Sequence, residues 1–400
     1  MRLISIKTSG YRNLAGEELK LSDGINLLYG NNAAGKTNTL ECAYVFASGK
    51  SFRAKQESEL IKKGENTARA DIEFEKTIYA DKKITENMSV IWHNSKEKGF
   101  VKRLLYRGYE VPKLSEFLGI FRAVLFTPDH LSLIKGSPEE RRRFMDIALS
   151  QIQPRYIFYL NSYLKILSQK NSYLKQALQA GKADHDYLDV INMQLSKAAA
   201  VLIKQRSGFV SLLKEYSSEV YGKISGDREL LDVKYISSTK RCFSDTEYTE
   251  NTLYEIYKNE RETELRNGRT FYGPHRDDLL IYITGKSGQA CDQEQKEQST
   301  VSELAARTFG SQGQQRSAVL SIKLAEGEIF KNITGEYPVF LFDDLLGELD
   351  KERRKFLTEL IKDRQAIITC CDKNAMPDMK NISEVHVSQG KYAYMQAEEA

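Results

Sequence analysis

Hydrophobic residues along the chain change their spacing twice, and each change predicts a different kind of structure. Residues 2–9 and 25–29 are short apolar runs bounded by turn-forming pairs, which is typical of β-strands. Residues 38–47 carry a helical pattern, and further strand-like runs follow at 69–76, 88–93, 101–106 and 121–126. The first section of the chain is therefore predicted to mix helices and strands.

From about residue 139 to residue 222 the apolar positions recur at helical spacing instead. Two apolar stripes, within 156–167 and 188–220, are separated by the turn Gly181–Asp184. At 1.5 Å per residue the two arms would be roughly 40 and 55 Å long. We therefore predict an antiparallel helical hairpin, which is too short for an extended coiled-coil arm.

After the hairpin the pattern returns to strands alternating with helices. The predicted elements are a strand at 229–236, a helix at 246–266, a loop GPHRDD at 273–278, a polar surface loop at 286–300, a helix at 313–334, a strand at 338–342, a helix at 351–362 and a strand at 366–370. The likeness between the first and last sections predicts one discontinuous α/β domain, at 1–135 and 301–400. The mainly helical segment 136–300 would be inserted into it.

The composition is that of an ordinary globular protein. Of the 400 residues, 41% are apolar and 28% are charged, and the net charge is +4. No run approaches the ~20 apolar residues that cross a bilayer, and the first ten residues lack the apolar core of a signal peptide. The five cysteines form no CxxC pair, which indicates free thiols and argues against a zinc ribbon. We expect a cytoplasmic protein with no membrane partner.

Residues 30–37, GNNAAGKT, match the phosphate-binding pattern GxxxxGK[ST] between a predicted strand and a predicted helix. Gly30 and Gly35 let the backbone curl so that its N–H groups point into one concavity, which holds phosphate oxygens. Lys36 would reach the β and γ phosphates of a nucleotide, and Thr37 would place its hydroxyl on Mg²⁺. The alternative is an ordinary glycine turn that caps a helix.

The run YPVFLFDD at 337–344 supplies a carboxylate partner for that metal. Its apolar part, 339–342, predicts a strand in the centre of a parallel sheet, and such sheets bind ligands at the carboxyl ends of their strands. Asp343 would then associate with Mg²⁺, and Asp344 would orient or deprotonate the attacking water. The alternative is an acidic loop that caps the helix at 351–362.

The segment SQGQQRS at 311–317 is a weaker signal. Ser311 and Gly313 can approach a phosphate closely where a helix begins, but a simple helix cap has the same composition. Its interest lies in its position, about two dozen residues before the carboxylate strand.

In this order the three motifs resemble the ATP-binding cassette heads of chromosome-maintenance and recombination ATPases, and most closely the RecF family of DNA replication and repair proteins. GNNAAGKTNTLE resembles the family's Walker A motif, SQGQQRS its signature motif, and FLFDDLLGELD its Walker B motif and D-loop. Further matches are Tyr11-Arg12-Asn13, Ser51–Arg53, the segment 136–146 and GPHRDD. The resemblance extends from residue 1 to about residue 370.

The resemblance implies an α/β fold, an ABC-type P-loop ATPase head called lobe I, with the segment 136–300 inserted as a mainly helical lobe II. The implied cofactors are ATP and Mg²⁺. Lys36, Asp343 and Asp344 would be catalytic, and Thr37 and Asp343 would serve the metal. The other residues implied to bind nucleotide are Gly30, Asn31, Asn32, Ala33, Ala34, Gly35, Arg12, Asn13, Ser311, Gly313 and Gln314.

The resemblance also implies partners. The signature motif of one subunit would complete the ATP site of a second copy, so that ATP joins a homodimer and slow hydrolysis releases it. The implied partners are single-stranded or gapped DNA, bound without sequence readout, and the RecR and RecO mediator proteins. The implied role is recombinase loading in recombinational repair and the SOS response. Two other readings stay open, namely an ATP-dependent dimerisation switch with little catalysis and a monomeric P-loop protein unrelated to DNA.

Two positions depart from the family pattern. Gly347 stands where the D-loop often begins with Ser, and Thr369-Cys370-Cys371 includes no histidine where a γ-phosphate-sensing residue is expected.

Two other groups of polar residues allow two interpretations each. His275 with Asp277 and Asp278 would be either a metal site or capping groups. Basic side chains within 96–113 would either track a DNA backbone or cover a solvated hairpin; they are Lys96, Lys98, Lys102, Arg103, Arg107 and Lys113.

Overall fold

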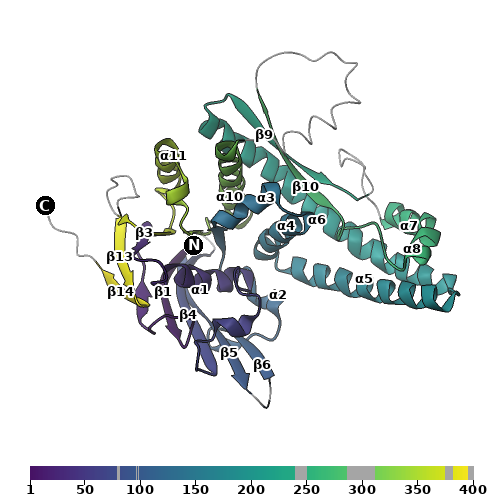
Figure 1. Ribbon diagram of the computed structural model, residues 1–400, viewed down its shortest axis with the longest axis horizontal. Coiled ribbons are helices and arrows are strands. Elements are labelled where there is room, and N and C mark those ends of the chain that lie inside the picture. The colour runs from purple at the N-terminus through teal and green to yellow at the C-terminus, as the bar shows by residue number, and fades with distance from the viewer. Residues whose placement is uncertain are drawn as a thin grey trace. The chain divides into compact units, whose positions relative to one another are not determined.

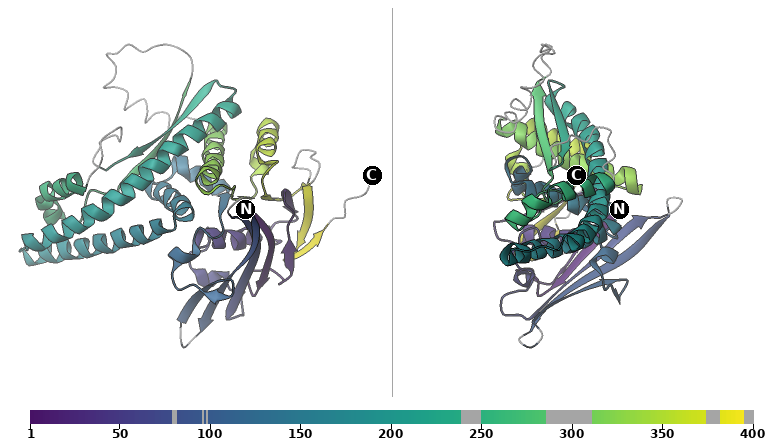
Figure 2. Two further views of the ribbon diagram at one scale, coloured as in Figure 1. Left: turned by 180° about the vertical axis from the view of Figure 1, so that it is seen from behind. Right: turned by 90° about the vertical axis from the view of Figure 1, so that its right-hand side faces the viewer.

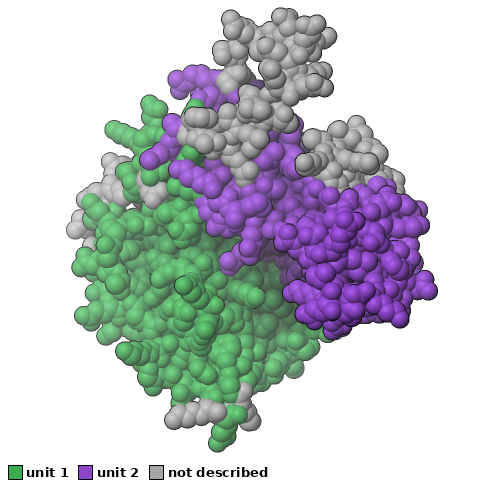
Figure 3. Space-filling view, turned by 45° about the vertical axis from the view of Figure 1, so that its right-hand side comes forward, with its two compact units in different colours: residues 1–131, 313–400 green, residues 132–312 purple. Residues whose placement is uncertain are grey.

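The computed structural model describes residues 1–78, 82–95, 97, 99–238, 250–285, 311–373 and 382–394. The chain divides into two compact units, which Figure 3 shows in different colours. Unit 1 contains Met1–Leu131 and Gly313–Ala400, and unit 2 contains Ser132–Gln312. The first predicted boundary, after residue 135, lies close to the observed division after Leu131. The second, after residue 300, lies before the observed division after Gln312. The predicted surface loop at 286–300 lies outside the described residues.

Unit 1 contains a mainly parallel sheet in the order β14-β13-β3-β12-β11-β8 (Figure 1). Its strands are β3 (Ile25–Tyr29), β8 (Ala123–Phe126), β11 (Val339–Phe342), β12 (Ala366–Cys370), β13 (Ile382–Ser388) and β14 (Lys391–Tyr394). The strand β11 is fully buried and pairs in parallel with β12 and β8, which confirms its predicted central place. Consequently, the loop after β3 and the acidic pair after β11 emerge at the same edge of the sheet.

Two helices of unit 1 are buried along most of their length. The helix α1 (Lys36–Ser48) follows β3, and α10 (Gln312–Thr334) precedes β11. A Cβ at Gly327 would lie 2.4 Å from the ring of Phe340, so a glycine is required where α10 packs against β11. A third helix, α11 (Lys351–Ile361), begins at Asp350, whose carboxylate accepts a hydrogen bond from the backbone N–H of Arg353.

A second sheet of unit 1 is antiparallel, in the order β2-β1-β4-β5-β6-β7. Its strands are β1 (Arg2–Ser9), β2 (Glu18–Lys20), β4 (Thr67–Thr77), β5 (Lys83–Ser95), β6 (Gly99–Tyr106) and β7 (Tyr109–Glu110). Buried and exposed positions alternate along β4, as expected for a strand with one face in the core. That face packs around Trp92 and Tyr11, whose rings are 5.5 Å apart and fully buried.

Unit 2 is built around α4 (Pro138–Ile152), α5 (Arg155–Ala180) and α6 (His185–Ser225). Figure 2 shows α5 and α6 as the predicted hairpin, connected through Gly181 with φ +63° and the helix cap Asp184. The strands β9 (Glu229–Ile236) and β10 (Asp278–Gly285) form an antiparallel pair, and β9 packs against α6. The predicted helix 246–266 is two helices, α7 (Glu250–Asn259) and α8 (Arg261–Asn267), and residues 246–249 lie outside the described ones.

Candidate functional site

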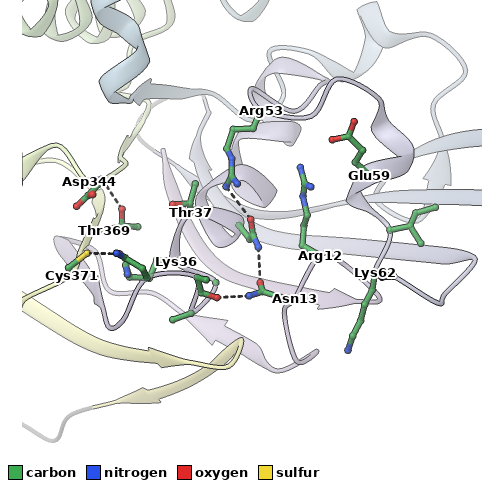
Figure 4. Close-up of a pocket in the computed structure, with 17 residues that line it drawn as sticks. Arg12, Asn13, Lys36, Thr37, Arg53, Glu59, Lys62, Asp344, Thr369 and Cys371 are labelled. Atoms are coloured by element: carbon green, nitrogen blue, oxygen red, sulfur yellow. Dashed lines mark hydrogen bonds between the residues drawn. The ribbon is translucent and has the colours of Figure 1, made fainter.

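A pocket of about 640 Å³ lies in unit 1, around the loop that connects β3 to α1 (Figure 4). Nine of the predicted site residues line it, and they come from three separate stretches of sequence: Arg12, Asn13, Asn32, Ala33, Ala34, Gly35, Lys36, Thr37 and Asp344. Further polar and charged groups at its walls are Asn38, Arg53, Glu59, Lys62, Lys63, Thr369 and Cys371. The fold therefore gathers the motifs that the sequence places far apart.

The loop of residues 30–37 has the curled backbone that the glycines predict. Gly30 has a φ of +147°, and a Cβ there would lie 2.2 Å from the carbonyl oxygen of Val387. Ala33 has a φ of +62°, which is uncommon for a residue with a side chain. The Asn13 amide donates a 2.8 Å hydrogen bond to the Ala33 carbonyl, so the residue predicted to bind nucleotide also supports the loop.

Lys36 folds back over this loop. Its Nζ donates hydrogen bonds of 2.6 and 2.9 Å to the carbonyl oxygens of Gly30 and Asn31, and the side chain is 7% exposed. An ammonium group held by two neutral carbonyls keeps its charge available for an anion in the pocket. Gly30 and Asn31 thus support Lys36 rather than line the pocket themselves.

Asp343 lies buried at the end of β11, beside the first turn of α1. Thr37 Oγ1 and Thr369 Oγ1 donate hydrogen bonds of 2.8 and 2.9 Å to the same carboxylate oxygen, Oδ1. Burial raises the pKa of Asp343, and the two hydroxyl donors act in the opposite direction. A hydroxyl and a carboxylate side by side are the oxygen ligands that Mg²⁺ takes in nucleotide sites.

Asp344 lies next to Asp343 but faces the pocket and is exposed. Its φ of +50° turns the chain so that the two neighbouring carboxylates take different environments. The two acidic residues therefore differ in their surroundings, as a metal-associated group and a water-facing group would.

Glu41, the last residue of the motif GNNAAGKTNTLE, supports the pocket wall, a role that the motif analysis did not assign to it. It lies on α1 with a fully buried side chain, and Arg12 donates hydrogen bonds of 3.0 and 2.9 Å to its two oxygens. Ser51 Oγ donates a further 2.5 Å hydrogen bond, and the same Ser51 oxygen accepts from the backbone N–H of Arg53 at 2.9 Å. The signal in the sequence was a lone carboxylate within the otherwise apolar stretch of a helix.

A series of hydrogen-bonded side chains connects this cluster to the loop of residues 30–37, which we call the phosphate loop after its predicted role. Arg53 Nη1 donates to Asn38 Oδ1 at 3.2 Å, and Asn38 Nδ2 donates to Asn13 Oδ1 at 2.7 Å (Figure 4). Arg12, Arg53 and the loop are thus connected through hydrogen bonds on one side of the pocket.

The predicted signature residues lie elsewhere. Ser311 is exposed and precedes α10, and Gly313 and Gln314 lie in its first turn; none of the three lines the pocket. Arg353 covers this turn, because a Cβ at Gly313 would lie 3.2 Å from its Nη2, and its Nε donates to Ser317 Oγ at 2.8 Å. The structure therefore does not bring these three residues to the pocket of the same chain.

The segment after β12 reaches the pocket without a histidine. Cys371 lines the pocket, and its Sγ–H donates to Asn32 Oδ1 at 3.0 Å. Gly347 is an exposed residue in the short 3₁₀ turn Leu346–Glu348.

The basic segment 96–113 is largely neutralised within the described residues. Lys102 pairs with Glu57 at 2.7 Å, Arg103 with Glu110 at 2.8 Å, and Arg107 with Glu86 at 2.5 Å. Hydrogen bonding to Arg107 lowers the pKa of Glu86 to about 2. Lys96 and Lys98 lie outside the described residues. These pairs favour the solvated hairpin over a strip that tracks DNA.

The loop GPHRDD is held by buried polar partners in unit 2. Arg141 binds Asp278 with hydrogen bonds of 2.7 and 2.9 Å, and Asp277 accepts from Tyr235 at 2.5 Å and from the backbone of Ser238 at 2.7 Å. His275 Nδ1 lies 2.6 Å from the hydroxyl of Tyr163. Among the described residues no group of three His, Cys, Asp or Glu side chains could hold a metal, which favours the capping interpretation.

None of the helices in the described part of the chain is long and apolar enough to cross a membrane.

Comparison with known proteins identifies the relatives of this chain. The family model for the RecF/RecN/SMC N-terminal domain matches residues 2–393. The DNA replication and repair protein RecF of an Exiguobacterium species is 36% identical over 98% of both chains, and that of Enterococcus faecalis is 37% identical over 98% of both. A solved structure of the recombination mediator protein RecF with ATP, in the RecFOR pathway, superposes on this chain with a TM-score of 0.83. The two chains are 30% identical, and the superposition covers 99% of this chain and 98% of the other. An Smc head with its ScpA domain shares the fold, with a TM-score of 0.54 at 16% identity, covering 100% and 99%.

Proposed function

This chain belongs to the RecF family of DNA replication and repair proteins, with the α/β fold of an ABC-type ATPase head, and from that premise we propose that it is an ATP-gated clamp for DNA repair. The observation that carries the proposal is the pocket: Lys36, Thr37 and Asp344 line it, and Thr37 donates a hydrogen bond to the neighbouring buried Asp343. We assign unit 1 to lobe I and unit 2 to lobe II of such a head.

The residues of the pocket fit ATP with Mg²⁺. The backbone at Gly30 leaves no room for a Cβ, and the loop N–H groups precede the start of α1, as in a phosphate cradle. Thr37 and Asp343, already hydrogen-bonded to each other, are the residues that would hold Mg²⁺. When bound, the metal would neutralise charge that develops on the phosphates.

The chain's own groups would carry the remaining steps. Lys36 would bind the β and γ phosphates, and Arg12 and Asn13, which also line the pocket, would orient the nucleotide. Asp344, exposed to the pocket, would orient or accept a proton from the attacking water. A RecF structure that is similar to this chain was solved with ATP, so ATP is the nucleotide we propose.

The pocket lacks the residues that the signature motif would supply. Ser311, Gly313 and Gln314 do not line the pocket of their own chain, so we propose that a second copy provides them. ATP would then join a homodimer, and hydrolysis would release it. The clamp would hold single-stranded or gapped DNA by its backbone and shape, and would assist recombinase loading with RecR and RecO in recombinational repair and the SOS response.

Light scattering with and without ATP–Mg²⁺ tests this proposal. We expect a dimer that forms only with ATP, and we expect Ser311→Arg to keep the protein monomeric while leaving the pocket of each chain intact. A monomer under every condition would overturn the clamp. Measurement of ATP turnover with and without DNA separates a weak DNA-stimulated ATPase from a dimerisation switch with little catalysis.

A further inference from the structure

Thr369 is the second-last residue of β12 and lies beside the pocket-lining Asp344 (Figure 4) and beside Asp343, which is buried after β11. Its side chain is 1% exposed, so solvent water does not serve its hydroxyl. The hydroxyl contacts each of the two acidic residues by one hydrogen bond.

The directions of these two bonds are determined by the groups that make them. The backbone N–H of Asp344 can only donate, so Thr369 Oγ1 accepts it, at 2.9 Å. The single hydroxyl proton is then free to donate to the carboxylate of Asp343 at 2.9 Å, a closer acceptor than the Phe342 carbonyl at 3.4 Å. One hydroxyl therefore orients one acidic side chain and fixes the backbone of the next residue.

The bond to Asp344 acts at a backbone position that needs support. Asp344 has a φ of +50°, a conformation disfavoured for a residue with a Cβ. Without Thr369 Oγ1 the Asp344 N–H would lose its partner, and the turn that aims Asp344 into the pocket would lose its restraint. Of its two hydroxyl donors among the described residues, the Asp343 carboxylate would keep Thr37.

We propose that Thr369 is a positioning residue for ATP hydrolysis, acting through Asp343 and Asp344 rather than touching the nucleotide. The inference rests on the proposed function and adds to it the residue that sets the relative geometry of the metal-associated and water-facing carboxylates. The end of β12 also touches the loop of residues 30–37, because Cys371, two residues on, donates a hydrogen bond to Asn32.

Thr369→Val and Thr369→Ser form the matched pair that tests it. Valine keeps the β-branched shape in a strand and removes the hydroxyl, whereas serine keeps the hydroxyl. For Thr369→Val we expect kcat for ATP to fall about 10–100-fold with KM changed less than about threefold, as for the loss of a group that orients a metal-associated ligand. Thr369→Ser should stay within about threefold of wild type.

A binding measurement separates positioning from general damage. In EDTA, a fluorescent ATP analogue should bind Thr369→Val with wild-type affinity. When Mg²⁺ is then titrated in, the Mg²⁺ concentration at half of the fluorescence change should be higher for the variant than for wild type. Asp344→Asn should lose turnover without that shift in Mg²⁺ requirement. If Thr369→Val is poorly folded by its melting temperature, Thr369→Ala removes the same hydroxyl without adding apolar bulk.

The outcomes distinguish this inference from the proposed function. If the variants that lack the hydroxyl keep the turnover and the Mg²⁺ requirement of wild type, the positioning role is overturned and the proposed function is not. Equal losses in the valine and serine variants would also overturn it, because the hydroxyl would then not be the group that matters. Wild-type protein that binds no nucleotide would overturn the proposed function and this inference with it.

Discussion

Replacement of Glu41 by glutamine probes how the pocket wall is held together. The fully buried carboxylate of Glu41 accepts two hydrogen bonds from Arg12, at 3.0 and 2.9 Å, and one from Ser51 at 2.5 Å. Glutamine has nearly the same shape, but its NH₂ group would face a guanidinium donor. The change therefore removes the charge and one acceptor without creating a cavity.

The size of the effect follows from burial. Removing one partner of a buried ion pair costs about 3–5 kcal/mol. The Arg12 side chain is 19% exposed, so water can partly replace the lost bond. We therefore expect a loss of about 2–3 kcal/mol, because hydrogen bonds to charged groups contribute about 1.5–3 kcal/mol. At about 2–4 °C per kcal/mol for a unit of this size, the melting temperature of unit 1 should fall by about 4–12 °C.

The assay combines thermal unfolding with titration of a fluorescent ATP analogue. Nucleotide affinity should fall as well, because Glu41 holds Arg12 directly and Arg53 through Ser51. Glu110→Gln is the matched control, since it breaks the exposed pair between Arg103 and Glu110 and should leave both measurements unchanged. A Glu41→Gln protein that melts within about 1 °C of wild type and binds the analogue equally well would refute this reasoning.

Two further predictions follow from the phosphate loop and from unit 2. Lys36→Ala should abolish binding of the fluorescent ATP analogue, because it removes the ammonium group held over the Gly30 and Asn31 carbonyls; unchanged affinity would show that the loop is not a nucleotide cradle. Burial lowers the pKa of His275 to about 4. The unfolded chain takes up this proton near pH 6.5 and the folded chain only near pH 4, so stability should fall as pH drops through that window. His275→Gln should reduce this pH dependence of the unfolding midpoint. An unchanged pH dependence would contradict the role given to His275. His93→Gln, at an exposed position of β5, serves as the control.

Features that depend on neighbours in the chain could be predicted from the sequence. The phosphate loop lies between β3 and α1 because its glycines and the strand–helix context are all local. The apolar run of β11 predicted a central parallel strand, since no exposed edge tolerates such a run, and the pairs with β12 and β8 confirm it. The hairpin of α5 and α6 followed in the same way from its two stripes and the Gly181 turn.

Features that depend on partners distant in the chain could not be predicted. The strands β13 and β14 carry short patterns that indicate little alone, and β13 is stabilised by its pairing with β3, more than 350 positions earlier. The sequence left open whether the basic residues of β6 face DNA, and it could not show that Lys102 pairs with Glu57, 45 positions earlier in the chain.

The sequence alone identified the candidate phosphate-binding loop at 30–37, because its pattern of glycines, Lys36 and Thr37 is local. Only the tertiary structure decided how those groups are held. Glu41 organises Arg12 and the Ser51 turn, and Thr369 contacts both acidic residues, across separations of 10 to 29 residues. A hydrogen bond of about 3 Å requires two atoms to meet in space, and that meeting is a property of the packed fold rather than of either residue's neighbours along the chain.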